Sequence, residues 1–171
     1  MQGIKPVPHV FVADDAFALK PFLMKPYPQR GLNIDQRVFN YRLSRARRIS
    51  ENTFGILANR WRVYYSAMQV GPTAAKSIVL ATLSLHNYLR KSQSRTAYSP
   101  VGLVDQITPD GTIVPGNWRD ERGSNYLRNF NVKRSGNNAS LEANEIRETF
   151  KEYFFNERAV PWQWNSCMDV V

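Results

Sequence analysis

The stretch SRARRISENTFGILANRWRVY, residues 44–64, decides the fold of this chain. It continues a series of apolar positions that starts at Ile34 and mostly recurs every three or four residues, a spacing that places them on one helix face. The series consists of Ile34, Val38, Tyr41, Ile49, Phe54, Leu57 and Trp61. Asn33 or Asp35 is a suitable cap. The sequence therefore predicts one long, arginine-rich helix over residues 33–62, with one side facing a core.

Working outward, the residues before this helix predict a strand and a loop. Residues 9–12 are apolar and β-branched and end abruptly at Asp14 and Asp15, as in a buried strand. Residues 16–24 predict a short helix despite Pro21. A loop follows, because two prolines and Gly31 interrupt any regular pattern.

The residues after it predict two more helices. Residues 72–91 carry apolar side chains on more than one narrow face, which predicts the most buried helix of the chain, with Pro72 in its first turn. Residues 92–140 lack any period and predict a long surface segment, partly disordered. A final amphipathic helix is expected over residues 141–156, with a helix-free tail after Pro161.

Composition limits the class of protein. The 171 residues are enough for one domain with a core, and no apolar run is long enough for a membrane span. The first residues lack the features of a secretory signal. Cys167 is the single cysteine, which excludes an internal disulfide and a cysteine-rich zinc site. An intracellular protein is expected.

Positive charge is concentrated in one quarter of the chain. Residues 20–62 contain ten Lys or Arg against Asp35 and Glu51, a surplus of eight out of a net charge of +9. This concentration favours a surface that meets a polyanion, with a solvated arginine-rich helix as the alternative. The candidate residues for binding a polyanion are Arg42, Arg45, Arg47, Arg48, Arg60 and Arg62.

Two carboxylates are the candidates for chemistry. Asp14 follows the predicted strand, where catalytic side chains of open α/β sheets are commonly placed. Glu51 lies among the arginines, on the helix face of Gly55, and a glycine inside a helix costs about 1 kcal/mol unless close packing requires it. The alternatives are a local cap for Asp14 and a salt bridge from Glu51 to Arg47 or Arg48.

Four blocks of the sequence resemble the Harbinger-type transposases and their domesticated nuclease relatives. VADDAFALKPFLMKPYP, residues 12–28, is similar to the signature of the second catalytic aspartate, here Asp14. Residues 44–64 resemble the signature of the catalytic glutamate, here Glu51 followed by Asn52, Thr53, Phe54 and Gly55. Residues 80–90, LATLSLHNYLR, and residues 145–164, EIRETFKEYFFNERAVPWQW, are similar to later blocks.

The resemblance implies an α/β ribonuclease-H-like domain in which three carboxylates hold two divalent cations. Asp14 and Glu51 are then catalytic metal ligands for Mg²⁺, with Mn²⁺ as the substitute, and the arginines hold DNA phosphates. The family's first aspartate and the initial strands of its sheet would lie upstream of residue 1. A partial, mostly helical domain is therefore expected, which alone does not cut DNA.

On this basis, residues 1–92 are the C-terminal part of the nuclease core, 93–140 a variable loop and 141–171 the C-terminal helix and tail. The alternative function is a non-catalytic DNA-binding protein domesticated from a transposase, and a relic without a stable fold is a third possibility. The resemblance also implies a nuclear protein, with the cytoplasm as an alternative, and a Myb-like DNA-binding partner. No membrane association is expected.

Overall fold

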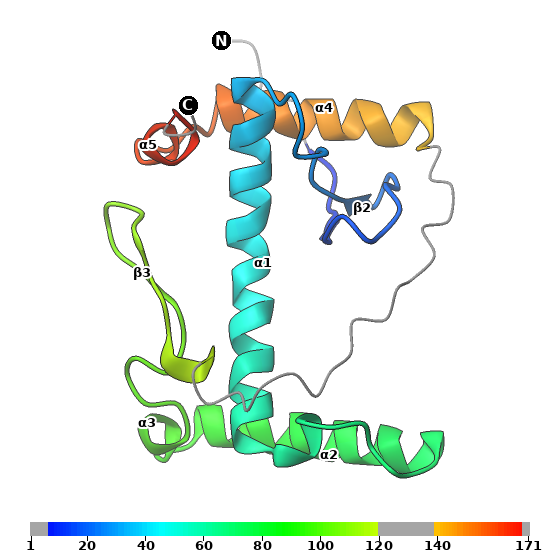
Figure 1. Ribbon diagram of the computed structural model, residues 1–171, viewed down its shortest axis with the longest axis vertical. Helices are drawn as coiled ribbons and strands as arrows, with labels where there is room; N and C mark the ends of the chain where they lie inside the picture. The colour runs from blue at the N-terminus through cyan, green and yellow to red at the C-terminus, as the bar shows by residue number, and fades with distance from the viewer. Residues whose placement is uncertain (1–6, 120–138, 169–171) are drawn as a thin grey trace. The chain divides into compact units, whose positions relative to one another are not determined.

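The computed structural model describes residues 7–119 and 139–168. The chain divides into two compact units, the first formed by Met1–Arg47 with Asn131–Val171 and the second by Arg48–Phe130. Helix α1, Ile34–Arg60, confirms the predicted long helix and contributes to both units (Figure 1). Each unit has a hydrophobic core of its own.

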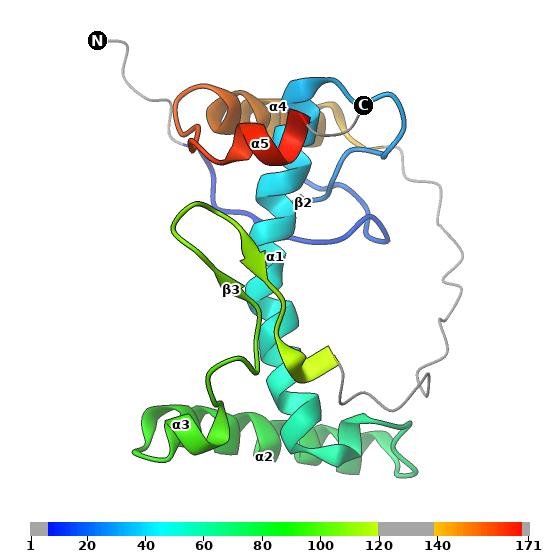
Figure 2. The same cartoon turned by 60° about the vertical axis from the view of Figure 1, so that its left-hand side comes forward.

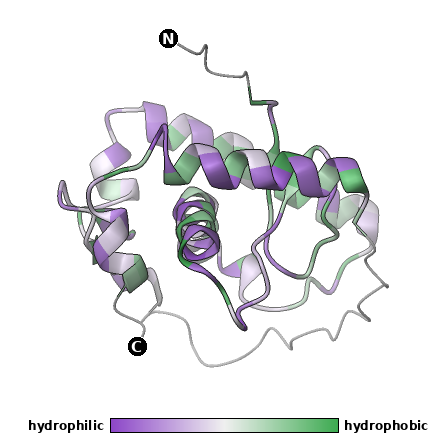
Figure 3. Ribbon diagram, turned by 90° about the horizontal axis from the view of Figure 1, so that it is seen from above, coloured by the Kyte–Doolittle hydropathy of each residue, from purple (hydrophilic) through white to green (hydrophobic). Residues whose placement is uncertain are grey.

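The first unit contains strands β1 (Phe11–Val12) and β2 (Leu23–Met24), which pair in parallel, and helices α4 (Leu141–Phe155) and α5 (Gln163–Met168). Helix α4 confirms the predicted final helix, and hydrophilic and hydrophobic residues alternate along it (Figure 3). The Tyr27 ring meets Phe39 edge-on at 5.3 Å between centroids. The buried core consists of Leu19, Met24, Tyr27, Phe39, Leu43 and Ala143.

At the start of the chain, the predicted strand is present as β1, but its predicted burial and the predicted helix after it are wrong. The strand before Asp14 is only two residues long and exposed, with Phe11 73% accessible. Residues 16–24 form no helix, because Lys20 and Leu23 exchange backbone hydrogen bonds across a tight turn that contains Pro21. A proline fits such a turn, since its ring fixes φ and it donates no backbone hydrogen bond.

The prediction of a helix-free tail is also wrong, because α5 begins two residues after Pro161. A proline just ahead of a helix removes no helical hydrogen bond. The fully buried Gln163 stabilises the turn, since its Oε1 accepts the Val160 N–H at 3.2 Å and its Nε2 donates to the Phe154 carbonyl at 3.2 Å.

The second unit contains the rest of α1, the 3-10 helix η1 (Arg62–Tyr64), α2 (Pro72–Lys91) and α3 (Arg95–Tyr98). Strands β3 (Gln106–Ile107) and β4 (Ile113–Val114) form an antiparallel hairpin, followed by the 3-10 helix η2 (Asn117–Arg119). Figure 2 shows η2 beside the C-terminal part of α1. Residues 93–119, predicted to be irregular, therefore contain short ordered elements.

Residues 120–138 of the predicted variable loop lie outside the described residues. The division into residues 1–92, 93–140 and 141–171 stays a prediction. The described residues form a mixed α/β structure dominated by helices, with a few short strands. In this part of the chain no helix has the length and apolar character needed to span a membrane.

Helix α2 has the predicted bounds, but the prediction that it is the most buried helix is wrong. Its two buried side chains are Thr82 and His86, whereas Leu80 and Leu85 are exposed. The packed face is set by polar contacts: His86 Nδ1 lies 2.9 Å from the Tyr98 hydroxyl, and the Tyr64 hydroxyl contacts Thr82. The number of apolar residues in a helix does not determine which face has a partner.

Candidate functional site

Asp14 lies in the turn that follows β1. Its Oδ1 accepts the Ala16 N–H at 3.0 Å, and its Oδ2 lies 3.7 Å from the Arg47 guanidinium. The Asp14 side chain remains 43% exposed. The carboxylate therefore closes a local turn and faces a cation, and it caps no helix, because none follows.

Glu51 lies on α1 in the second unit and is partly exposed. Asp14 belongs to the first unit, so the proximity of these two carboxylates stays a prediction. What the structure does establish is how the helical turn around Glu51 is held, through Arg48, Asn52 and Gly55.

A buried aspartate, Asp105, holds this turn from a distant part of the sequence. Its side chain is 0% exposed, with Oδ2 2.8 Å from Arg48 Nη1 and Oδ1 accepting the Gly116 N–H at 2.9 Å. A buried carboxylate needs both a countercharge and hydrogen bonds to offset its lost hydration. Asp105 has both, so it ties the base of the β3–β4 hairpin to α1.

The Asn52 side chain binds the backbone of Asp105. Its Nδ2 donates to the Asp105 carbonyl and its Oδ1 accepts the Asp105 N–H, both at 3.1 Å. Arg48 and Asn52 are one helical turn apart and flank Glu51 in sequence. Both residues that bracket Glu51 therefore hold Asp105, which restricts movement of the Glu51 turn.

Gly55 completes this contact. A Cβ built there would lie 2.6 Å from the Trp118 ring, closer than side-chain packing tolerates. The prediction that Gly55 serves close packing is confirmed, and its partner is the indole ring of Trp118. These contacts fix one face of α1. We call the five residues that form them the clamp: Arg48, Asn52, Gly55, Asp105 and Trp118.

Sequence reasoning missed Asp105 because it lies in a segment without periodicity. One signal was present: Asp105 is the first acidic residue after Glu51. A lone carboxylate that follows the apolar run Val101–Val104 is a candidate for burial. Its partners on α1, Arg48 and Asn52, however, lie more than 50 positions earlier, and no local pattern connects them with Asp105.

Three of the predicted DNA-binding arginines are engaged with the first unit. Arg42 donates to the Arg158 carbonyl at 3.3 Å and lies over the Phe154 ring, and burial lowers the pKa of its guanidinium. Arg45 donates to the Tyr41 hydroxyl at 2.7 Å and lies over Trp162. Arg47 faces Asp14. Such contacts limit the freedom of a guanidinium to reach a phosphate.

The other three lie in the second unit. Arg48 is paired with Asp105. Arg60 donates to the carbonyls of Tyr98 and Ala97 at 2.6 and 3.1 Å, yet the residue as a whole remains exposed. Arg62 is exposed in η1. Five of the six candidates thus have intramolecular contacts, and their assignment to DNA binding stays a prediction.

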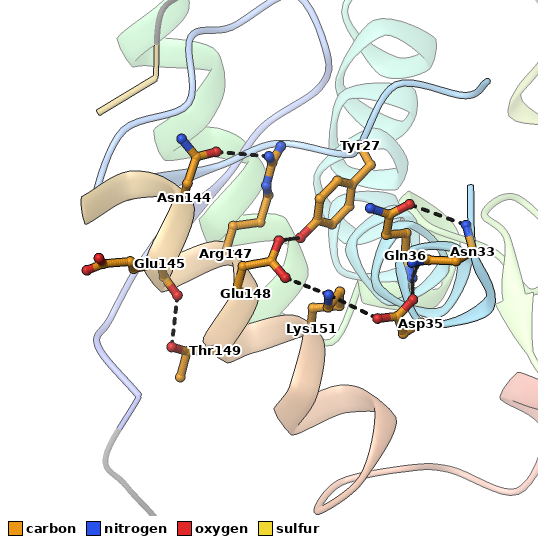
Figure 4. Close-up of polar contacts among 10 residues, drawn as sticks. All are labelled: Tyr27, Asn33, Asp35, Gln36, Asn144, Glu145, Arg147, Glu148, Thr149 and Lys151. Atoms are coloured by element: carbon orange, nitrogen blue, oxygen red, sulfur yellow. Dashed lines mark hydrogen bonds and ion pairs between the residues drawn. The ribbon is translucent and has the colours of Figure 1, made fainter. Parts of the chain in front are cut away.

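A second polar cluster connects the chain ends in the first unit (Figure 4). The Tyr27 hydroxyl donates to Glu148 at 2.6 Å, and Lys151 bridges Glu148 and Asp35 at 2.5 and 2.9 Å. Burial, followed by the bond to Glu148, raises the pKa of Tyr27 above its usual range. The cluster is internally satisfied and joins α4 to α1.

The charges in this cluster stabilise one another. The hydrogen bond to Glu148 is the main reason that the pKa of Lys151 is raised. Burial acts to raise the pKa of Glu148, but the bonds from Lys151 and Tyr27 with nearby positive charge outweigh it, so the pKa of Glu148 is lowered. We therefore interpret the cluster as structural.

A metal centre was tested against the donors that the chain supplies. Within residues 7–119 and 139–168, no three or more His, Cys, Asp or Glu side chains gather closely enough to hold a metal ion. Carboxylate oxygens such as those of Asp14 and Glu51 are the donors that Mg²⁺ prefers. The donor type fits, but the described residues do not form a complete two-metal site.

Comparison with known proteins identifies one family. The family described as DDE superfamily endonuclease matches residues 1–87, slightly more than half of the 171-residue chain. The matched region includes Asp14 and Glu51 and ends inside α2, so Asp105 and Trp118 lie beyond it. No curated protein and no solved structure matches the chain.

Proposed function

Because the chain belongs to the DDE superfamily endonuclease family, we propose that it is part of a Harbinger-type transposase nuclease with a ribonuclease-H-like fold. The family indicates a transposase-type nuclease with DNA as the substrate and a general use of divalent metals. The observation that carries the proposal is the family match over residues 1–87, because both signature carboxylates lie inside it.

Within this proposal Asp14 and Glu51 are the catalytic metal ligands, for Mg²⁺ or its substitute Mn²⁺. When bound, a pair of such ions supplies an acidified water and stabilises the leaving oxygen of a phosphodiester. Among the described residues, no three carboxylates or other metal-binding side chains gather closely enough to hold a metal ion. The proposal therefore includes inactivity of this chain on its own.

Non-catalytic DNA binding, in a protein domesticated from a transposase, is the second candidate function. It is favoured by the Arg47 guanidinium, which lies 3.7 Å from Asp14 Oδ2 and competes with a metal for that oxygen. A nuclease needs both Asp14 and Glu51. A binding protein loses nothing when either is neutralised, and gains affinity for a polyanion from the removed negative charge.

The experiment is a nicking assay with supercoiled plasmid, the purified full chain, and Mg²⁺ or Mn²⁺. We expect no nicking above that of the Asp14→Ala and Glu51→Gln variants. Metal-dependent nicking that either substitution abolishes would contradict the inactivity of this chain and support the roles of the two residues. DNA affinity of the same three proteins, measured in EDTA, separates binding from cleavage.

Location and partner follow from the resemblance alone. We propose a nuclear protein, with the cytoplasm as the alternative, and a Myb-like partner that supplies DNA targeting. Expression of the tagged chain with and without such a partner, followed by fractionation of nuclei, tests both.

A further inference from the structure

The second unit contains a long stretch without acidic residues. Between Glu51 and Asp105 the sequence has no Asp or Glu, whereas it has six Lys or Arg. All six lie in the part of the chain that the structure describes. They are Arg60, Arg62, Lys76, Arg90, Lys91 and Arg95.

Four of these cations surround helix α3. Arg90 and Lys91 are the last two residues of α2, and Arg95, the first residue of α3, follows after three residues. Arg60 reaches the other end of α3 through its bonds to the Ala97 and Tyr98 carbonyls. We call Arg60, Arg90, Lys91 and Arg95 the α3 corner, and Figure 1 shows α3 beside the end of α2.

The α3 corner is anchored in the core of the second unit. Tyr98 is buried, its hydroxyl lies 2.9 Å from His86 Nδ1 on α2, and the two rings meet edge-on at 5.5 Å. Tyr98 also packs with Ile56 of α1 in the core cluster. Helices α1, α2 and α3 therefore hold these cations on a fixed framework rather than on a loose loop.

Positive charges at the corner have no partner in an ion pair among the residues that the structure describes. All four residues are exposed. The charge of Arg90 acts on both His86 and Tyr98, and that of Arg60 acts on Tyr98, which shows that the two guanidinium groups influence the same small region.

Helix-dipole stabilisation explains only part of this arrangement. Cations in the last turn of a helix are favourable, which accounts for Arg90 and Lys91 on α2 and for Arg60 on α1. Helix α3 is a single turn of four residues, so Arg95 belongs to its first and its last turn alike, and the dipole rule does not account for a cation there. An external anion would relieve the repulsion among all four.

We propose that the α3 corner binds the phosphate backbone of double-stranded DNA. The inference rests on the proposed function for the identity of the polyanion. It moves DNA contact away from Arg42, Arg45, Arg47 and Arg48, which have contacts within the protein, to exposed cations at the end of α1 and on α2 and α3. Three of the four corner residues lie beyond the family match, which ends at residue 87.

The test measures affinity for a labelled DNA duplex by fluorescence anisotropy across a series of salt concentrations, using the full chain without divalent metal. The corner variant carries Arg90→Gln, Lys91→Gln and Arg95→Gln. Its matched control carries Lys20→Gln, Arg30→Gln and Lys76→Gln, three exposed cations outside the corner, so both variants lose the same charge.

Each phosphate contact contributes about 0.9 to the slope of log affinity against log salt. We expect the magnitude of this slope to be smaller than that of the parent chain by about 2 to 3 in the corner variant, and by about 1 or less in the control variant. Arg95→Glu alone should weaken binding more than Lys76→Glu. Circular dichroism and thermal unfolding of each variant establish that the fold is retained.

Equal losses in the two triple variants would overturn the inference, because total charge rather than the corner would then govern binding. Unchanged binding by the corner variant would overturn it too, while leaving the proposed nuclease function standing. If the parent chain binds no DNA at all, the assignment of DNA fails both for the α3 corner and for the proposed function. Tighter binding to vesicles of anionic phospholipid than to DNA would identify a membrane surface instead and reject the inference.

Discussion

The two units stabilise arginine-rich helix α1 in different ways. In the first unit, aromatic rings and carbonyl groups from the C-terminal segment receive the guanidinium groups of Arg42 and Arg45. In the second, one fully buried carboxylate receives Arg48. The density of arginine along a helix therefore reports internal packing as readily as it reports a DNA-binding surface, because guanidinium groups stack on rings and pair with buried acids.

The units also differ in what they leave exposed. The first unit satisfies its charged cluster internally, through Tyr27, Glu148 and Lys151. The second leaves Leu80 and Leu85 of α2 exposed, together with the cations of the α3 corner. Both units expose large apolar side chains, since Phe11 and Leu141 of the first unit are exposed too, so the feature that distinguishes the second unit is the α3 corner. Substitutions in each unit test this contrast.

The largest effect is expected for Asp105→Ala. Removal of one partner from a buried ion pair leaves Arg48 without its countercharge and costs about 3–5 kcal/mol. Urea unfolding of the full chain measures the loss. Asp110→Ala is the control, because that carboxylate lies in the exposed turn of the hairpin and forms local hydrogen bonds with Thr108 and Thr112.

A second variant keeps this prediction informative if Asp105→Ala does not fold. Replacement of the pair by apolar residues, Arg48→Met with Asp105→Leu, should recover much of the lost stability, since buried pairs are often replaceable by hydrophobic side chains. An unchanged urea midpoint for Asp105→Ala would show that the clamp does not stabilise the second unit.

A smaller effect is expected for Gly55→Ala. Alanine favours a helix over glycine by about 1 kcal/mol, but its Cβ would collide with the Trp118 ring. Overpacking of this kind costs about 1–3 kcal/mol, so the net change should be destabilising. Ser50→Ala, at an exposed position of the same helix, is the control. A higher melting temperature for Gly55→Ala would mean that helix propensity outweighs the indole contact.

The smallest effect concerns pH and the first unit. The pKa of Glu148 is lowered in the folded state, so its ionised form contributes stability that is present above the ordinary carboxyl value of 4.5 and is lost as the pH falls through the folded pKa. Glu148→Gln should therefore flatten the acid limb of a stability profile measured by thermal unfolding. Glu145→Gln on the same helix, at an exposed position, should leave that limb unchanged.

The long helices were predictable because spacing of three to four residues survives in the sequence of α1, α2 and α4. Burial was not. Helix α2 contains enough leucine for a core helix, yet its packed face is chosen by Thr82 and His86, whose partners come from other elements. Residues 16–24 became turn and strand because tertiary pairing with β1 outweighed local helix preference.

The candidate site was predictable only where chemistry follows a local motif. Asp14 and Glu51 stand out by their signatures, and the family match includes both. The bonds of Asn52 to the Asp105 backbone did not follow, since an asparagine beside Glu51 gives no sign of its partner. Long-range pairs such as Arg48 with Asp105 depend on chain topology, which a single sequence does not encode in any short window.

The first unit is assembled from both ends of the chain, with Tyr27 bonded to Glu148 across 121 positions. During synthesis, the ribosome therefore releases Phe39 and Met24 long before Phe150 and Phe154 exist to cover them. The second unit, whose described residues form one continuous stretch, can fold first. Nascent chains stalled before α4 should consequently display an apolar patch that chaperones recognise. Newly made protein is therefore most prone to aggregate before the first unit is complete.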